Sequence, residues 1–445
     1  MRRLAVAVLL LVAACAQPSA PVLTNAKAPA TPEVGSAIPA GETAWSNRSL
    51  ARVFTELTHG LEWGPSRPAL VRYEAPVRVR LSGPGSNQYG AFLDRYLSFL
   101  RQNAGVDIAT ALASANLHIR FVEGRRFAKK LPAISCVVAP GDLDWSDFSR
   151  DPDRLGGVAL ERAQQISDMT IFIPQNAAPY LIRSCLIEET AQALGPANDL
   201  YGLGPTIFND DAAHIWPTAL DVLMLRVLYQ PEMRTGLSKR ETEARALAIL
   251  DRLNSAGQSA PAIGVPRDGA LASWRDTHRE IFSRATSQNS APSYARRALD
   301  LAERRAPGSP YHCHSLQTLG RVLARRAPAE ALGVLDRATT TCARVHGIGD
   351  IRLSLIALER AIALARQGSY TAVLQSLASH EKRLADNRQE ERLAALYNLR
   401  AKAHGALGQT AKADAAAKLA VKWAAYAYGS GSSTVLRMTR SGASG

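Results

Sequence analysis

The chain has 445 residues, enough for two or three domains, and its 47% content of hydrophobic residues is typical of globular proteins. The formal net charge is +14, but the basic residues are scattered along the chain and form no long cluster. We therefore expect a solvated basic surface, with a dedicated anion site as the alternative. Beyond the N-terminus no run of about 18 apolar residues occurs, so no transmembrane helix is predicted.

The N-terminus has the three parts of a secretory signal. Two arginines are followed by the apolar run 4–12 and by two alanines directly before Cys15. The segment VAAC at 12–15 resembles the bacterial lipobox, in which the peptide is cut before a cysteine that then carries acyl chains. We therefore predict a signal peptide at 1–14 and lipidation of Cys15. The alternative is an ordinary cleaved signal with an incidental cysteine.

Residues 15–42 are rich in Ala, Pro, Thr and Ser and are predicted to form an extended tether behind the lipid anchor. Ala16 follows the cysteine, where an Asp would resemble an inner-membrane retention signal, so the outer membrane is favoured. The expected location is the bacterial cell envelope, on the side that faces the periplasm. Export makes nucleic acid an unexpected partner.

Residues 43–254 combine strand and helix patterns and are predicted to form one α+β domain. Apolar residues with helical spacing or with alternation mark the elements. We predict helices at 50–61, 88–104, 178–194, 217–229 and 241–253, and strands at 76–81, 117–123, 134–139 and 170–174.

Residues 255–290 are predicted to be a linker, and beyond them Ala, Leu and Arg dominate and strand patterns vanish. Helical segments then follow in pairs, and Gly368 and Gly408 occupy matching turns 40 residues apart. The last pair resembles a tetratricopeptide repeat. The expected array covers 291–428, and the tail 429–445 is predicted to be disordered. The pairs are 310–326 with 329–345, 350–367 with 369–386, and 390–407 with 410–428.

Four cysteines remain once Cys15 is set aside, an even number in an exported chain. Their places in the two halves favour the pairs Cys136–Cys185 and Cys313–Cys342. The second pair also has a geometric argument, because its cysteines lie at similar distances on either side of a predicted helical turn. The alternatives are four free thiols or a zinc site, and the absence of CxxC spacing disfavours zinc.

The segment 183–211 is the one that could carry chemistry. It contains Glu188-Glu189-Thr190-Ala191-Gln192, then Gly195, then Asn198-Asp199. This layout resembles the zincin metalloprotease motif HExxHxxGxxH/D, in which two histidines on one helix face bind zinc and the intervening Glu is the general base. Zincins also place an edge strand before this helix, here TIFIP at 170–174.

Both zinc histidines of that motif are absent, because Glu188 and Gln192 stand in their places. Such a pair is a poor zinc site, whereas oxygen donors suit a divalent cation such as Ca²⁺, Mg²⁺ or Mn²⁺. Glu189 occupies the position of the catalytic base. Asn198 and Asp199 are the next candidate metal or ligand residues, and Asp210, Asp211 and His214 could complete an oxygen-rich site.

The pieces CVV at 136–138, CxxEExxQxLG at 185–195, Asn198-Asp199 and IFND at 207–210 together resemble the domain-of-unknown-function 2927 family over about residues 45–250. This resemblance implies a fold relation and no known activity.

Three interpretations of the candidate site stay open: structural residues, a metal or ligand site without zinc, and a hydrolytic site. His118 and His214 are each interpreted as structural. The favoured function is a non-catalytic binding or scaffold protein, with an envelope protein or peptide as partner. The first alternative is an unusual metal-dependent hydrolase that acts in the periplasm. The second is a lipid-anchored structural module whose basic surface rests on an anionic polymer.

Overall fold

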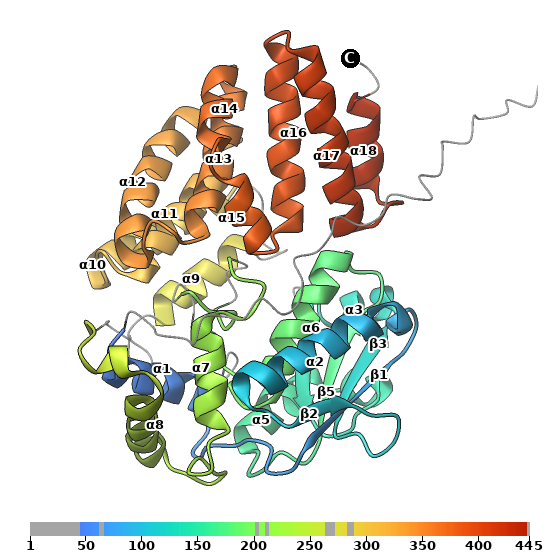
Figure 1. Ribbon diagram of the computed structural model, residues 1–445, viewed down its shortest axis with the longest axis vertical. Helices are drawn as coiled ribbons and strands as arrows, with labels where there is room; N and C mark the ends of the chain where they lie inside the picture. Colours follow the sequence, from blue (N-terminus) through green and yellow to red (C-terminus); the bar gives the residue numbers. More distant parts are fainter. Residues whose placement is uncertain are drawn as a thin grey trace, which may run out of the picture.

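The computed structural model describes residues 45–61, 66–132, 134–200, 204–209, 213–262, 272–282 and 289–442. Within these residues an α/β domain is followed by an all-helical region (Figure 1). The predicted signal peptide, Cys15 and the tether lie outside the described residues. No helix among the described residues is long and apolar enough to cross a membrane.

The first domain is built on one five-stranded sheet with the order β2-β1-β3-β5-β4. The first four strands in this order run parallel and β4 is antiparallel to β5. The strands are β1 (Val77–Ser82), β2 (Ile108–Thr110), β3 (Leu117–Val122), β4 (Val137–Pro140) and β5 (Met169–Pro174). The short strand β2 was not predicted from the sequence.

The sheet has apolar side chains on both faces, because helices and loops cover both sides. On β5, Ile171 and Ile173 belong to the larger core of the domain, whereas Phe172 belongs to a second cluster with Trp145 and Phe148. The surrounding helices are α1 (Asn47–His59), α2 (Gly90–Ala104), α3 (Gly124–Lys130), α4 (Trp145–Phe148), α5 (Ala159–Arg162), α6 (Pro179–Ala193), α7 (Ala219–Leu228) and α8 (Lys239–Leu253).

The prediction that TIFIP at 170–174 is an edge strand was wrong. This segment is β5, which pairs with β3 on one side and with β4 on the other, so β4 is the edge strand. An apolar run without alternation is typical of a strand that is covered on both faces, and β5 is such a strand.

The helical region begins earlier and ends later than predicted. Helix α9 (Ala272–Phe282) lies within the predicted linker, and its Trp274 and Ile281 belong to the core of the following helices. Helix α18 (Ser433–Gly442) lies within the predicted disordered tail, where Val435 packs with Ala394 and Ala424.

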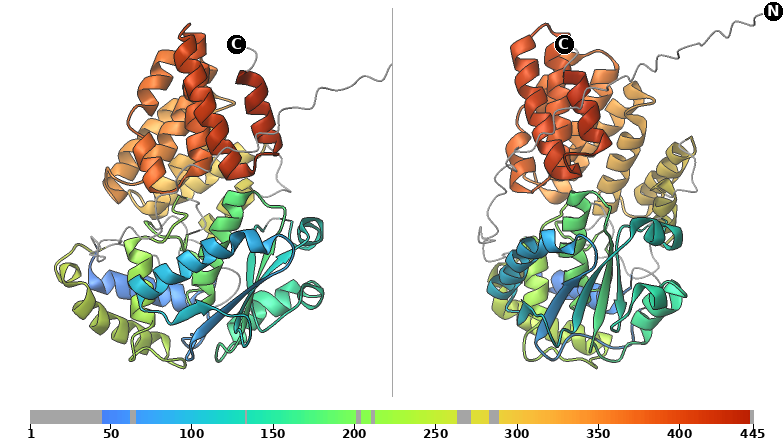
Figure 2. Two further views of the ribbon diagram at one scale, coloured as in Figure 1. Left: turned by 45° about the vertical axis from the view of Figure 1, so that its right-hand side comes forward. Right: turned by 90° about the vertical axis from the view of Figure 1, so that its right-hand side faces the viewer.

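Most of the remaining helices lie beside the helix that follows them in the chain (Figure 2). One predicted helix, 369–386, is in fact two, α14 and α15, interrupted at residues 378–380. The bounds are α10 (Ala291–Arg305), α11 (Pro310–Leu323), α12 (Pro328–His346), α13 (Arg352–Arg366), α14 (Tyr370–Leu377), α15 (Glu381–Asp386), α16 (Glu390–Ala406) and α17 (Thr410–Tyr428).

Three turns of this region share one backbone hydrogen-bond pattern. The residues at 368, 388 and 408 have positive φ, and the amide that follows each donates to the carbonyl five residues before it. Gly368 and Gly408 adopt this left-handed conformation easily. The middle turn has Arg388 with φ 56° instead.

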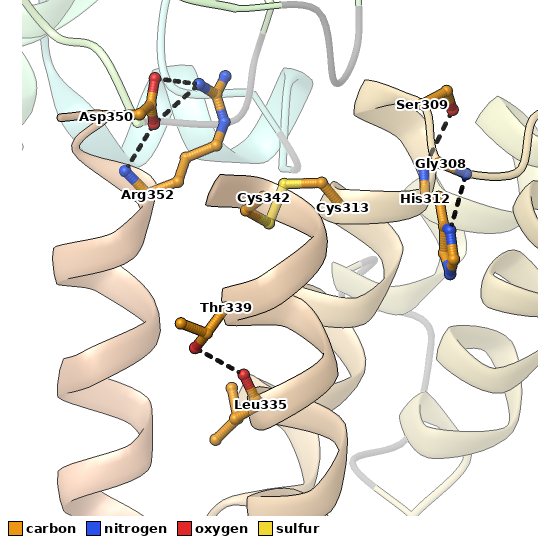
Figure 3. Close-up of a disulfide and its surroundings, with 9 residues drawn as sticks. All are labelled: Gly308, Ser309, His312, Cys313, Leu335, Thr339, Cys342, Asp350 and Arg352. Carbon is orange, nitrogen blue, oxygen red and sulfur yellow. Dashed lines mark hydrogen bonds and ion pairs between the residues drawn. A yellow bond between two sulfur atoms is a disulfide. The ribbon is translucent and has the colours of Figure 1, made fainter. Parts of the chain in front are cut away.

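Both predicted disulfides are present. Cys136–Cys185 connects the segment before β4 to α6. Cys313–Cys342 connects α11 to α12 (Figure 3), as expected for facing positions in an antiparallel helical pair.

Candidate functional site

Helix α6 carries the zincin-like sequence and follows β5 after a short loop. Pro179 occupies its first turn, where a missing amide hydrogen has little cost. The helix stops before Gly195, whose φ is 144°. A Cβ at Gly195 would lie 3.0 Å from Leu228 and 3.1 Å from the carbonyl oxygen of Val71, so this turn requires glycine.

The two glutamates of the motif differ in their exposure. Glu189 is buried, with 7% of its surface exposed, whereas Glu188 is half-buried. Next to them, the Tyr96 hydroxyl donates a hydrogen bond to the carbonyl oxygen of Ile187 at 3.0 Å. Burial raises the pKa of Tyr96 well above its usual value, and the charges of Asp221 and Glu188 add to this shift. A proton is therefore held firmly on Tyr96 beside the motif.

Gln192 and Asp199 are brought together by the turn after α6. The Gln192 side-chain amide donates to the carboxylate of Asp199, with Nε2–Oδ1 and Nε2–Oδ2 distances of 3.2 and 3.4 Å. Gln192 occupies the position of the second histidine in the zincin motif, and Asp199 directly follows Asn198, which occupies the position of the third ligand. An amide nitrogen directed at the carboxylate does not fit a cation held between them.

Asn198 is directed away from this pair and toward α1. Its Nδ2 donates to the Glu56 carbonyl oxygen at 2.9 Å, and its Oδ1 is buried without a hydrogen-bond partner. Asp210 and Asp211 lie outside the described residues. In the described part of the chain, no group of three or more His, Cys, Asp or Glu residues is arranged to hold a metal ion.

His118 and His214 each have a carboxylate neighbour outside the motif. His118 is on β3, buried, and its two ring nitrogens lie 3.6 Å from Asp142 and from Asp168. His214 has Nε2 3.9 Å from Asp350, which precedes α13, so it belongs to the contact between the first domain and the helical region.

Asp221 is a buried carboxylate that the sequence analysis missed. It accepts hydrogen bonds from the Thr206 hydroxyl, the backbone amides of Ile207 and Thr218, and the Thr218 hydroxyl. Burial raises its pKa to about 6 although these hydrogen bonds act in the opposite direction. Thr218 and Asp221 form a capping box at the start of α7, and this Thr-x-x-Asp spacing was the available sequence signal. Asp221 therefore fixes the loop after α6.

A small pocket lies between the two parts of the chain and was also missed. The α6 side provides Tyr180, Arg183 and Ile187, which share one helix face, and Trp216 adds a wall from the loop before α7. The helical region contributes further lining residues, including Arg388, Glu390 and Tyr426. No sequence pattern could have indicated this pocket, because its residues come from segments far apart in the chain.

Two guanidinium groups of the pocket lie over aromatic rings. The guanidinium carbon of Arg388 lies 3.9 Å from the ring centre of Trp216, and that of Arg183 lies 4.2 Å from the ring centre of Tyr426. Arg183 also approaches Glu390, with an Nη2–Oε1 distance of 3.9 Å. Burial raises the pKa of Glu390, and the charge of Arg183 opposes this rise.

Further contacts connect the loop after α6 to the helical region. Arg352 is fully buried and pairs with Asp350 at 3.2 Å (Figure 3). A Cβ at Gly204 would lie 2.1 Å from an Arg352 side-chain nitrogen, so the guanidinium lies directly against this loop. Gln389 donates from Nε2 to the carbonyl oxygen of Ala213 at 2.9 Å. The helical region thus packs against the loop that follows the motif helix.

Among the comparisons with known proteins, the one match covers only the first domain. No curated protein and no solved structure matches the chain. The region of the chain from α1 into α8, residues 47–247, matches the family described as "Protein of unknown function (DUF2927)".

Proposed function

We propose that this protein is a lipid-anchored, periplasm-facing protein of the bacterial cell envelope that binds a protein or peptide partner without catalysis. In this proposal the first domain is zincin-like and has lost its zinc site. The observation that carries the proposal is the hydrogen bond between Gln192 and Asp199. The side chain at the position of the second histidine is thus bonded to a neighbouring carboxylate, which favours a structural role for both side chains.

The position of Glu189 alone does not supply a hydrolytic mechanism. A general base without a Lewis acid lacks several kcal/mol of the transition-state stabilisation that a metalloprotease obtains from its metal. Glu189 is also buried, whereas a base must come within hydrogen-bond reach of the water that it activates. These two points favour binding over hydrolysis.

The helical region supports the binding role. Its antiparallel helices follow one another in the manner of a tetratricopeptide-like array, and such arrays present extended surfaces to proteins and peptides. In this proposal the array and the first domain form one binding surface, because the array packs against α6 and the loop after it.

The anchoring part of the proposal rests on the sequence 1–42. A lipid on Cys15 followed by an extended tether would hold the protein at the outer membrane, since each buried methylene group contributes about 0.8 kcal/mol to membrane binding. Radiolabelled fatty acid should appear on the wild-type protein and not on Cys15→Ser. Equal labelling of both proteins would contradict the anchor.

A peptide selection tests the binding role. The full protein is immobilised and used to enrich a random peptide library, and the enriched peptides are then incubated with the protein in solution and examined by mass spectrometry. Binding with intact peptides, at an affinity that Glu189→Gln leaves unchanged, is the expected result. No enrichment would contradict the binding role. Cleavage by the wild type and not by Glu189→Gln would establish the hydrolase alternative instead.

A further inference from the structure

The pocket between the two parts of the chain has walls from both of them. It is small, with a cavity volume of about 20 Å³, which is room for one or two water-sized groups. It therefore suits a single functional group of a ligand and not a whole side chain. Sites between domains are common places for ligands.

The lining of this pocket is basic and aromatic. Arg183 and Arg388 are mostly buried, with 13% of the Arg183 side chain and 9% of Arg388 exposed. The guanidinium carbon of each lies over an aromatic ring, and Arg183 also donates from Nη2 to the Tyr426 carbonyl oxygen at 3.4 Å. Each guanidinium carries five N–H donors in its own plane. Glu390 is the acidic residue among the lining residues, which therefore carry two positive charges and one negative charge.

The backbone at Arg388 provides an independent argument. In the matching turns at 368 and 408 the residue with positive φ is glycine, and Arg388 adopts the same conformation with a φ of 56°. A non-glycine residue in this conformation has a conformational cost, and such residues concentrate at functional sites. In return for this conformational cost, position 388 has a guanidinium that lies against Trp216, which a glycine would lack.

We propose that this pocket binds one carboxylate group of a peptide, through the planar N–H donors of Arg183 and Arg388. Guanidinium groups recognise carboxylates by paired hydrogen bonds, and a carboxylate is small enough for the cavity. This inference rests on the peptide-binding function proposed above and adds the chemistry of the ligand. The carboxylate is either the C-terminus of the peptide or an acidic side chain. Because the pocket has walls from both parts, the bound peptide would hold them together.

Titration calorimetry of the full protein with defined peptides tests this assignment. The probes are N-acetylated pentapeptides of alanine: one with a central Glu and an amidated end, its Gln counterpart, one with a free C-terminus, and its amide. A peptide with a carboxylate is expected to bind about tenfold or more tightly than its uncharged counterpart. A preference within the Glu/Gln pair identifies a side-chain carboxylate, and one within the acid/amide pair identifies a C-terminus. Equal affinity within both pairs, or no binding by any probe, would overturn the proposal.

Substitutions of the two arginines test whether the preference for a carboxylate arises in the pocket. Arg388→Gly removes the guanidinium but keeps a residue that suits the turn, so the protein should fold normally and bind the carboxylate peptide about tenfold more weakly. Arg183→Gln should weaken binding in the same way. Arg400→Gln is the matched control, since Arg400 lies over the ring of Tyr397 and pairs with Glu381, outside the pocket. Unchanged affinity in the two pocket variants, with thermal unfolding showing a folded protein, would also overturn the proposal.

The two proposals can fail separately. If library peptides bind but replacing their carboxylates leaves the affinity unchanged, the carboxylate pocket is wrong and the binding role stands. If the library yields no binders and no pentapeptide binds, both proposals fail together.

Discussion

Two buried histidines make the stability of this protein sensitive to acid. His59 bonds to the Arg67 carbonyl oxygen and the Thr242 hydroxyl, and burial lowers its pKa to about 4, with the charges of Arg67 and Lys239 adding to the shift. Burial lowers the pKa of His314 to about 3, and the charges of Arg352, His346 and Arg321 act in the same direction. Both histidines are therefore neutral in the folded protein at neutral pH.

We predict that the free energy of unfolding falls as pH decreases below about 6.5. The unfolded chain binds protons at its histidines from that pH downward, whereas His59 and His314 in the folded protein stay neutral until about pH 4 and 3. Each histidine contributes a loss of about 1.4 kcal/mol per pH unit in this interval. Urea unfolding of the wild type and of His59→Gln over this range measures the difference in slope.

Thr242→Val is the control for this prediction. It removes the hydroxyl that bonds to His59 but leaves the imidazole buried, so it should lower stability while the dependence on pH remains. Parallel pH profiles for the wild type and His59→Gln would show that His59 does not contribute to acid sensitivity.

Individual residues also explain why the candidate site could be predicted only in part from the sequence. The sequence placed Glu188, Glu189 and Gln192 on one helix, and α6 confirms this placement. The bond from Gln192 to Asp199 depends on the path of the chain after Gly195, where backbone packing sets the direction of the turn. Spacing within a helix is local, but the direction of a loop is decided by what the loop packs against.

At the scale of elements, the disulfide Cys136–Cys185 connects the edge of the sheet to the motif helix. The two cysteines are 49 residues apart, and closing a loop of this length lowers the entropy of the unfolded chain by an amount equivalent to about 4 kcal/mol. We predict that Cys136→Ser with Cys185→Ser lowers the free energy of unfolding by about 2–4 kcal/mol in urea titrations.

The comparison for this prediction is Cys313→Ser with Cys342→Ser, which opens a loop with a sequence separation of 29 and should give a loss of similar size. In a Cys15→Ser background, the oxidised protein should not react with a thiol probe under denaturing conditions without reductant. Labelling of any cysteine there would contradict the disulfides.

The ends of helices were predicted well where residues next to them in the sequence mark the end. They were predicted poorly where contacts with other elements determine the end. The helix over 178–194 was confirmed, because proline and glycine mark its two ends. Helix α18 was missed, since its flanking glycines and serines favour disorder, and contact of Val435 with Ala394 and Ala424 stabilises it instead. The break between α14 and α15 was also missed, because no proline or glycine lies between the two helices.

At the scale of the whole molecule, the ion pair of Arg352 and Asp350 lies buried where the helical region meets the first domain. We predict that Asp350→Asn lowers the free energy of unfolding by about 3–5 kcal/mol, because it leaves the charge of Arg352 buried without its carboxylate. Asparagine can still accept the hydrogen bond from the Arg352 amide, so the start of α13 is preserved. Chemical unfolding of the purified protein measures the change.

Two further variants make this prediction specific. Replacing both partners, with Asp350→Leu and Arg352→Met, should recover most of the lost stability, since neither charge of the pair is then buried. Asp386→Asn breaks the exposed pair with Lys382 and should cost less than about 1 kcal/mol. An equal loss of unfolding free energy for Asp350→Asn and Asp386→Asn would show that the buried ion pair contributes no more to stability than the exposed one.

The sequence by itself determined the features that depend on neighbouring residues. These are the helices and strands with clear periodicity, the glycine turns at 368 and 408, and the zincin-like spacing along one helix. Each arises because side chains within one or two turns share a face or a cap. The cysteine pairing was also predicted, because the places of the four cysteines in the two halves of the sequence favour one of the three possible connectivities, and both of its disulfides are present.

Only the tertiary structure decided which distant segments meet. It placed β4 at the edge of the sheet, joined Gln192 to Asp199, and brought Arg183 to Tyr426 across 243 residues of sequence. The pocket, the stacked arginines and the buried pair of Asp350 with Arg352 all lie where the two parts of the chain pack together. Such contacts depend on complementary packing between whole elements, and no pattern within a single element specifies that packing.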